Sequence, residues 1–186
     1  QTSLRASQHL SRLISDLLNL SKLDSGKVQL DVQSVSLQDL FFDASAALAQ
    51  QIAANENQLI FKGAEQEVHL MTDYMRLMQI LINLVSNANN HTLNGVITVS
   101  FDPSEINGKV NDFIPVSDTG CGIREESIKT IFEPFAQDDS ATIRTQPGTG
   151  LGLTITRAIC RLLNGDIYVH STSDRGSTFT VVLPNT

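Results

Sequence analysis

The sequence has 186 residues, enough for one domain with an appendage and for a sizeable core. Apolar residues make up 41% and charged residues 18%, which excludes wholesale disorder, and the net charge of −7 argues against nucleic acid as a partner. No apolar run is long enough for a membrane span, no signal-peptide pattern opens the sequence, and its 2 cysteines form neither a disulfide framework nor a zinc motif. We therefore expect a reducing, cytoplasmic compartment.

Residues 4–24 are predicted to form a helix, because leucine and isoleucine recur at the spacing of one broad apolar face. A single amphipathic helix at the edge of a domain cannot bury such a face alone. A partner helix is expected outside this sequence or on another subunit. Ser25 and Gly26 end the helix, since glycine is common just after a helix C-terminus.

The next elements alternate between strand and helix. A short strand is expected within residues 28–35, and Ser36 with Asp39 forms a capping box that opens a second helix. Residues 59–61 and 68–71 are predicted as short strands. The apolar positions of the second helix are Leu37, Leu40, Phe41, Ala44, Leu48 and Ile52.

A third helix is predicted over residues 73–91, followed by paired strands at 95–101 and 110–117 around a turn at 103–108. Proline cannot donate to a sheet ladder, so we expect a break or bulge at Pro115. After a short helix at 124–130, an apolar helix follows residue 152, and strands at 167–170 and 177–183 end the chain.

Polar residues share one stripe of the predicted helix at 73–91. Arg76, Asn83, Asn87 and Asn90 fall at steps of seven, four and three, so they lie on one side of the helix. Asparagine is a poor helix former. The row is therefore either a solvated polar face or a line of amide oxygens suited to a hard cation such as Mg²⁺.

Two glycine-rich segments follow. Asp118 ends a predicted strand and begins Asp-Thr-Gly-Cys-Gly-Ile123, which is either an Asp-initiated turn or a carboxylate at the floor of a pocket. Gly148, Gly150 and Gly152 lead into an apolar helix, and form either a flexible turn or a loop that cradles phosphate at a helix N-terminus. The polar residues 136–147 between the two segments are expected to form a lid.

Four segments then stand in a fixed order, and together they resemble the catalytic, ATP-binding domain of a bacterial sensor histidine kinase. The segments are Asn83-Leu-Val-Ser-Asn87-Ala, Asp118-Thr-Gly-Cys-Gly122, Phe132-Glu-Pro-Phe135 and Gly148-Thr-Gly-Leu-Gly152-Leu. They match the family's asparagine box, first glycine box, phenylalanine box and second glycine box. The phenylalanine box and the Gly-Ser-Thr-Phe179 near the end resemble the hybrid type.

The resemblance implies an α/β fold: a two-layer sandwich of a mixed β-sheet against three helices, preceded by one amphipathic helix. Residues 1–26 are similar to the second helix of the dimerisation and phosphotransfer hairpin. Residues 27–186 are similar to the catalytic ATP-binding domain.

The resemblance also implies a site for ATP and Mg²⁺. Asp118 is expected to accept the adenine amino group in a pocket shaped by Gly120 and Gly122, and Asn87 to hold Mg²⁺. Asn83 is expected to be a second metal contact and is the one candidate catalytic residue. The remaining residues expected to bind ATP are Asn90, Ile123, Phe132, Arg144, Gly148, Thr149, Gly150, Leu151, Gly152 and Leu153.

Besides Pro115, the sequence departs from the family pattern in two places. Asn90 stands where a phosphate-contacting lysine is expected, and amide cannot neutralise phosphate charge. No phosphoacceptor helix is present, because His9 lies on the wrong helix and is interpreted as a surface residue. The sequence is therefore not expected to phosphorylate itself.

The expected function is transfer of the ATP γ-phosphate to a histidine on a helix absent from this sequence. Asn83 occupies the place where ATP-hydrolysing members of the superfamily carry a glutamate base, which favours the kinase. The alternative is a degenerate nucleotide-binding or docking module without kinase activity. The expected partners are the phosphoacceptor helix and a receiver domain or response regulator, within a homodimeric, membrane-anchored parent.

Overall fold

The computed structural model describes residues 2–26, 28–65, 67–106, 109–136 and 149–185. The helices are α1 (Thr2–Asp24), α2 (Leu37–Ala54), α3 (Tyr74–His91), α4 (Glu125–Ile128) and α5 (Gly152–Leu162). The strands are β1 (Val32–Ser36), β2 (Gln58–Lys62), β3 (His69–Asp73), β4 (Val96–Ser100), β5 (Asp102–Ile106), β6 (Lys109–Asp118), β7 (Asp166–Ser171) and β8 (Ser177–Pro184).

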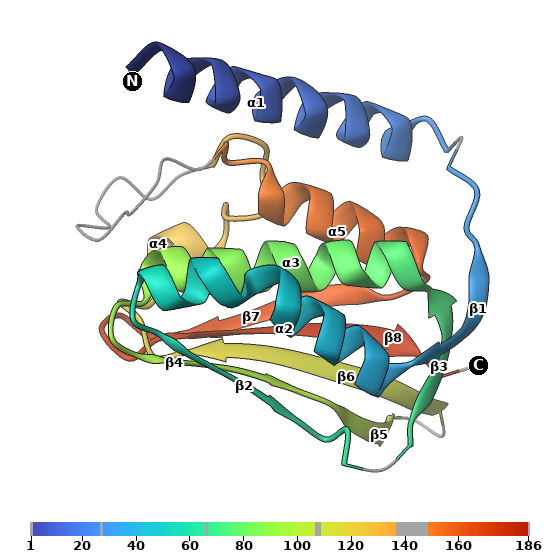
Figure 1. The fold of residues 1–186 in the computed structure, drawn as a ribbon. Coiled ribbons are helices and arrows are strands. Elements are labelled where there is room, and N and C mark those ends of the chain that lie inside the picture. Colours follow the sequence, from blue (N-terminus) through green and yellow to red (C-terminus); the bar gives the residue numbers. More distant parts are fainter. Residues whose placement is uncertain (1, 27, 66, 107–108, 137–148, 186) are drawn as a thin grey trace.

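The main sheet is mixed and has six strands. Its order is β2-β4-β6-β8-β7, with β5 paired to the first half of β6. β2 and β4 run parallel, and every other neighbouring pair is antiparallel. Helices α2, α3 and α5 cover one face of this sheet, while β1 and β3 form a separate two-stranded ribbon (Figure 1). The predicted two-layer sandwich of a mixed sheet against three helices is confirmed.

Local capping explains where two of these helices begin. The Ser36 hydroxyl accepts a hydrogen bond from the backbone N–H of Asp39 at 3.2 Å, and the Asp73 carboxylate accepts from that of Arg76 at 3.0 Å. Each cap satisfies one of the N–H groups that a helix start leaves unpaired, which is worth about 1 kcal/mol. Both predicted helix starts are confirmed.

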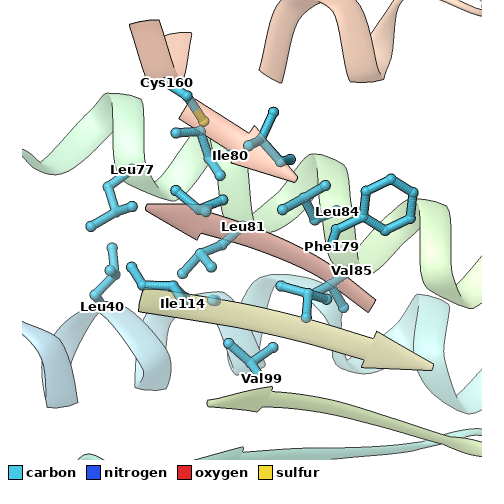
Figure 2. Close-up of a cluster of buried hydrophobic side chains, with 14 of the residues drawn as sticks. Leu40, Leu77, Ile80, Leu81, Leu84, Val85, Val99, Ile114, Cys160 and Phe179 are labelled. Atoms are coloured by element: carbon cyan, nitrogen blue, oxygen red, sulfur yellow. The ribbon is translucent and has the colours of Figure 1, made fainter. Parts of the chain in front are cut away.

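The core lies between the three helices and the sheet. The apolar stripe of α3 faces inward onto β6, β4 and β8, where it meets Ile114, Val99 and Phe179 (Figure 2). Burying one such leucine or isoleucine side chain contributes about 1.5–3 kcal/mol, so this stripe holds the two layers together. The α3 residues of the stripe are Leu77, Ile80, Leu81, Leu84, Val85 and Ala88.

The predicted turn at residues 103–108 is wrong over most of its length. Asp102–Ile106 is strand β5, which pairs antiparallel with the first half of β6. Proline and aspartate are depleted in strands, so the local sequence argues against a strand that the neighbouring β6 nevertheless supports.

The break predicted at Pro115 is present on one side of β6 and absent on the other. Its pairing with β8 continues through the pair Pro115↔Thr180. On the other side, pairing with β4 ends at Val116 and pairing with β5 begins at Phe113. Ile114 and Pro115 are therefore unpaired on that side of β6, while the strand itself runs on without a bulge.

Helix α1 lies along α5, on the side of α5 away from the sheet (Figure 1). Its residues Leu13, Leu20 and Leu23 are half-buried against the core. Another group on the same helix is more than half exposed, namely Leu10, Ile14, Leu17 and Leu18. The helix is confirmed, and a partner for its exposed face stays a prediction. Among the described helices, none combines the length and hydropathy of a membrane span.

Candidate functional site

Asp118 is a nearly buried carboxylate at the C-terminal end of β6, with 9% of its surface exposed. It accepts a hydrogen bond from the backbone N–H of Gly120 at 2.8 Å and one from the Thr92 hydroxyl at 3.5 Å. Burial raises the pKa of Asp118, and the donors Gly120 N–H, Ser177 N–H and Thr92 hydroxyl partly offset this. A carboxylate held in this way is a fixed acceptor for an N–H donor of a ligand.

The turn after Asp118 is packed too tightly for any residue but glycine at two positions. A Cβ on Gly120 would lie 2.2 Å from the His91 carbonyl oxygen, and one on Gly122, where φ is +68°, would lie 2.1 Å from that of Thr172. The turn is therefore wedged between the end of α3 and the β7–β8 hairpin. Packing within the chain therefore requires glycine at both positions, and the role of Gly120 and Gly122 in shaping a ligand pocket stays a prediction.

Three polar residues at this end of the sheet were missed from the sequence. Thr92 and Ser177 donate to Asp118, and the Ser171 hydroxyl accepts from the backbone N–H of Ile123 at 2.8 Å. Ser171 and Ser177 are remote in sequence from the glycine turn and reach it only through the β7–β8 hairpin. No local motif marks them. Thr92 follows the asparagine segment closely in the sequence, so its position was a usable signal.

The asparagine side chains on α3 have different surroundings. The Asn83 amide nitrogen donates to the Gly152 carbonyl at 3.5 Å and to the Thr156 hydroxyl at 3.4 Å, which joins α3 to the start of α5. Asn87 is half-buried and has no hydrogen-bond partner among the described residues. Asn90 lines a hollow of about 330 Å³ with residues of α2, including Gln50. Whether Asn90 contacts a ligand stays a prediction.

The asparagine amides on α3 could supply only a few of the ligands that a magnesium ion needs. No group of three or more His, Cys, Asp and Glu side chains that could hold a metal gathers in the described part of the chain. Mg²⁺ keeps several waters and binds through few protein groups together with phosphate oxygens. The amide oxygens of Asn87 and Asn83 have no donor among the described residues, so this donor set is compatible with such an ion.

The first turn of α5 has the character of an anion site. Its N-cap residue Leu151 makes no side-chain capping bond, and helix-start N–H groups carry partial positive charge. The Thr149 hydroxyl accepts from the Leu151 N–H at 3.3 Å and donates to the Asp16 carboxylate of α1 at 2.9 Å. Leu151 is fully buried and Leu153 half-buried against the core, so both anchor the helix start.

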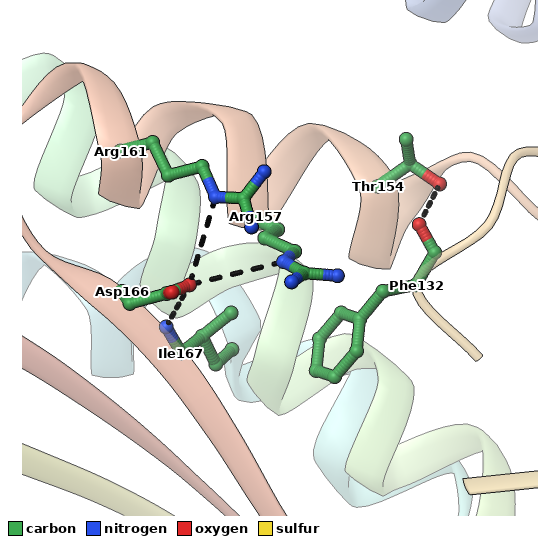
Figure 3. A network of polar contacts seen from close by, with 6 residues as sticks. All are labelled: Phe132, Thr154, Arg157, Arg161, Asp166 and Ile167. Carbon is green, nitrogen blue, oxygen red and sulfur yellow. Dashed lines mark hydrogen bonds and ion pairs between the residues drawn. The ribbon is translucent and has the colours of Figure 1, made fainter. Parts of the chain in front are cut away.

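The phenylalanine segment is tied to α5. The Phe132 ring meets Phe179 edge-on, with centroids 6.4 Å apart. The Arg157 guanidinium carbon lies 5.4 Å from the Phe132 centroid (Figure 3). The Phe132 carbonyl accepts from the Thr154 hydroxyl at 3.1 Å. The asparagine segment and the Asp118 turn thus meet at α3, and the phenylalanine segment packs on α5, which begins within the second glycine segment.

Some expected residues lie outside the described part of the chain. They are Arg144, Gly148, residues 137–147 of the predicted lid and the side chain of His9. Their roles stay predictions.

Comparisons with known proteins agree on one family. The family model described as "Histidine kinase-, DNA gyrase B-, and HSP90-like ATPase" matches residues 72–186. The chain is 35% identical over 186 residues to the autoinducer 2 sensor kinase/phosphatase LuxQ of Vibrio parahaemolyticus, covering 95% of this chain and 21% of LuxQ. It is 34% identical over 181 residues to the sensor histidine kinase GacS of Pseudomonas protegens, covering 96% and 20%. The chain therefore spans about a fifth of the length of these curated relatives.

Solved structures share the fold. Full-length ShkA in complex with AMPPNP is 27% identical with a TM-score of 0.84, over 98% of this chain and 37% of ShkA. ThkA in complex with the response regulator protein TrrA is 26% identical with a TM-score of 0.72, over 97% and 49%. AdeS of Acinetobacter baumannii is 23% identical with a TM-score of 0.79, over 98% and 82%, and shows the fold alone.

Proposed function

Because the chain belongs to the family of histidine kinase-, DNA gyrase B- and HSP90-like ATPases, we propose that it transfers the γ-phosphate of ATP to a histidine in a two-component kinase. The observation that carries this proposal is the grouping of the described parts of the four motif segments around α3 and α5. A buried acceptor, Asp118, lies at one end of it and the uncapped start of α5 at the other. A nucleotide has the matching ends, an amino group on the base and a chain of phosphates.

The roles follow from the chemistry of each group. Asp118 accepts the adenine amino group, since a carboxylate can only accept. The N–H groups at Gly152 and beyond face the phosphates at the start of α5. Asn87, with Asn83 beside it, contributes amide oxygen to Mg²⁺. When bound, Mg-ATP supplies the phosphoryl group and the neutralising charge.

Asn83 favours a kinase over an ATP hydrolase. A hydrolase needs a base that takes a proton from water, and an amide cannot do so. A histidine imidazole is already a nucleophile, so its phosphorylation depends mainly on positioning. Asn83 fits a positioning role because its amide bridges α3 to Gly152 and Thr156.

A degenerate nucleotide-binding module is the second candidate. The observation in its favour is Asn90, which replaces a charged residue of the family pattern and lines a hollow beside α2. A module of this kind would bind nucleotide, or none, without transferring phosphate.

We further propose that residues 1–26 act as the second helix of a dimerisation and phosphotransfer hairpin, and residues 27–186 as the catalytic domain. The exposed leucines of α1 support this, because they need a covering partner. The parent is then a homodimeric, membrane-anchored sensor with this part in the cytoplasm. Its onward partner is a receiver domain or response regulator, as in the ThkA complex with TrrA.

The test is phosphotransfer in trans. The chain is mixed with γ-labelled ATP, Mg²⁺ and a phosphoacceptor hairpin of a related sensor kinase. We expect acid-labile, alkali-stable label on the hairpin, less of it with Asp118→Asn, and none on the chain itself. ATP binding without any label on the hairpin would favour the degenerate module.

A further inference from the structure

Arg157 lies between a carboxylate and an aromatic ring. Its Nε is 3.8 Å from Asp166 Oδ1, and its guanidinium carbon is 5.4 Å from the centre of the Phe132 ring (Figure 3). A distance of 3.8 Å is an ion pair and too long for a hydrogen bond. Nε is buried and has no hydrogen-bond partner among the described residues. The Arg157 side chain is 40% exposed, and its guanidinium lies between the Asp166 carboxylate and the Phe132 ring.

Phe132 is fixed by contacts from two elements. Arg157 and Thr154 reach it from α5, and Phe179 reaches it from β8. The Thr154 bond holds the backbone, whereas Arg157 and Phe179 hold the ring. Arg157 is the one charged group in this set, so its contact depends on the ring's π face.

The turn that Phe132 begins leads to the second glycine segment. Three residues later, the backbone N–H of Phe135 donates to the Gly150 carbonyl at 3.0 Å. Phe135 has φ of +63°, a conformation that a bulky side chain adopts only when the surroundings impose it. A shift of Phe132 would therefore be passed to Gly150 and to the start of α5.

We propose that Arg157 is a positioning residue for the phosphate end of the nucleotide site. It acts through Phe132 and Phe135 on Gly150, and it does not itself touch the nucleotide. The inference rests on the proposed function, because it takes the start of α5 as the place where phosphates bind. It adds a residue that none of the four motif segments contains.

Arg161 provides a matched control on the same helix. Its Nε lies 3.9 Å from the same Asp166 oxygen, but it has no contact with Phe132 among the described residues (Figure 3). Arg157→Gln and Arg161→Gln therefore each remove one positive charge and one ion pair with Asp166. Only the first also removes the contact with the ring.

The experiment compares the affinities for ATP and for adenosine in the wild type and both variants. Arg157→Gln should weaken ATP binding about two- to fivefold, the scale of one cation–π contact, with adenosine nearly unchanged. Arg161→Gln should leave both affinities as in the wild type. Equal effects of the two variants, or an equal loss for ATP and adenosine, would overturn the proposal.

Two further variants separate positioning from folding. Arg157→Lys keeps the charge but loses the planar guanidinium, so it should restore part of the ATP affinity. Phe132→Leu removes the ring, and adding Arg157→Gln to it should cost little more, because the two residues act as one unit. If the losses of ATP binding free energy from Phe132→Leu and Arg157→Gln add fully in the double variant, the proposal is contradicted. This holds even if the single variant Arg157→Gln is unstable. A wild-type chain that binds no ATP would instead contradict the proposed function.

Discussion

At the scale of single residues, the charge of Asp118 lowers stability, and its proposed role in binding requires that charge. Its pKa is raised mainly by burial, so its charged form is less stable in the folded chain than in water. An acid with a raised folded-state pKa stabilises the fold most at low pH, and this contribution is lost as pH rises through that pKa. At neutral pH the charge therefore costs folding free energy. The proposed donation from the adenine amino group to this carboxylate would explain why a charge is retained there.

Asp118→Asn tests this conflict. ATP affinity should fall by about 1.5–3 kcal/mol, the scale of a hydrogen bond to a charged group. The wild type should gain stability relative to the variant as pH falls from 7 toward the ordinary aspartate pKa of 3.8, because protonation removes the buried charge. Calorimetric titration and urea unfolding at several pH values measure the two effects. Unchanged ATP affinity would reduce Asp118 to a turn residue.

Tyr74 allows a second test with a clear spectroscopic signal. Its hydroxyl donates to Asp43 Oδ2 at 2.5 Å, and this bond, with the nearby carboxylates, raises the pKa of Tyr74 to about 12. The stabilisation from this raised pKa is present below the ordinary value of 10.0 and is lost as pH rises through about 12. Asp43→Asn should lower the pKa of Tyr74, as measured by tyrosinate absorbance. The same midpoint in both proteins would show that the bond does not hold.

At the scale of elements, the helices were more predictable than the strands. Helices α2 and α3 carry both an apolar stripe and a capping residue, so local pattern and tertiary packing agree. Strand β5 contains Pro103 and is a strand only because β6 lies beside it. The same limit applies to the site. Asp118 and its glycines form a local motif, whereas Ser171 and Ser177 reach that turn from strands that are distant in sequence.

The contact between α1 and α5 puts a negative charge beside the proposed phosphate site. Asp16 binds the Thr149 hydroxyl, which in turn accepts from the N–H of Leu151 at the helix start. Asp16→Asn keeps a hydrogen-bond acceptor but removes the repulsion of phosphate. ATP affinity should rise by about 0.3–1 kcal/mol, the scale of one charge at a helix end. The gain should shrink at high salt, because it is Coulombic.

Titration of Asp16→Asn at two salt concentrations measures this effect, with adenosine as the control ligand because it carries no phosphate. A fall in ATP affinity would mean that the charged contact shapes Thr149 for binding. An equal gain for adenosine would mean that Asp16 acts on the pocket as a whole.

Two free cysteines offer a test of packing between elements. Cys160 is buried in α5, and burial together with the charge of Asp166 raises the pKa of its thiol to about 12. Cys121 is only half-buried, in the glycine turn. At pH 8 an alkylating reagent should modify Cys121 first and Cys160 only after unfolding. Mass spectrometry measures the modification of each cysteine, and rapid modification of Cys160 in the native chain would contradict the packing of α5.

At the scale of the whole molecule, the two layers of the fold each carry one part of the proposed nucleotide site. The sheet and the hairpin β7–β8 hold Asp118 and its glycine turn, and the helical layer holds Asn83, Asn87 and the start of α5. Thr92, at the end of α3, links the two by its contact with Asp118. A nucleotide that spans from the sheet to α5 would bind both parts at once. Its binding should therefore stabilise the whole chain.

The central claim is that this chain binds ATP by both its base and its phosphates. Calorimetric titration with ATP and with adenosine, each with and without Mg²⁺, tests it most directly. We expect both ligands to bind, ATP more tightly than adenosine, with Mg²⁺ strengthening only the binding of ATP. Binding of neither ligand at millimolar concentration, or equal affinities that do not respond to Mg²⁺, would contradict the account.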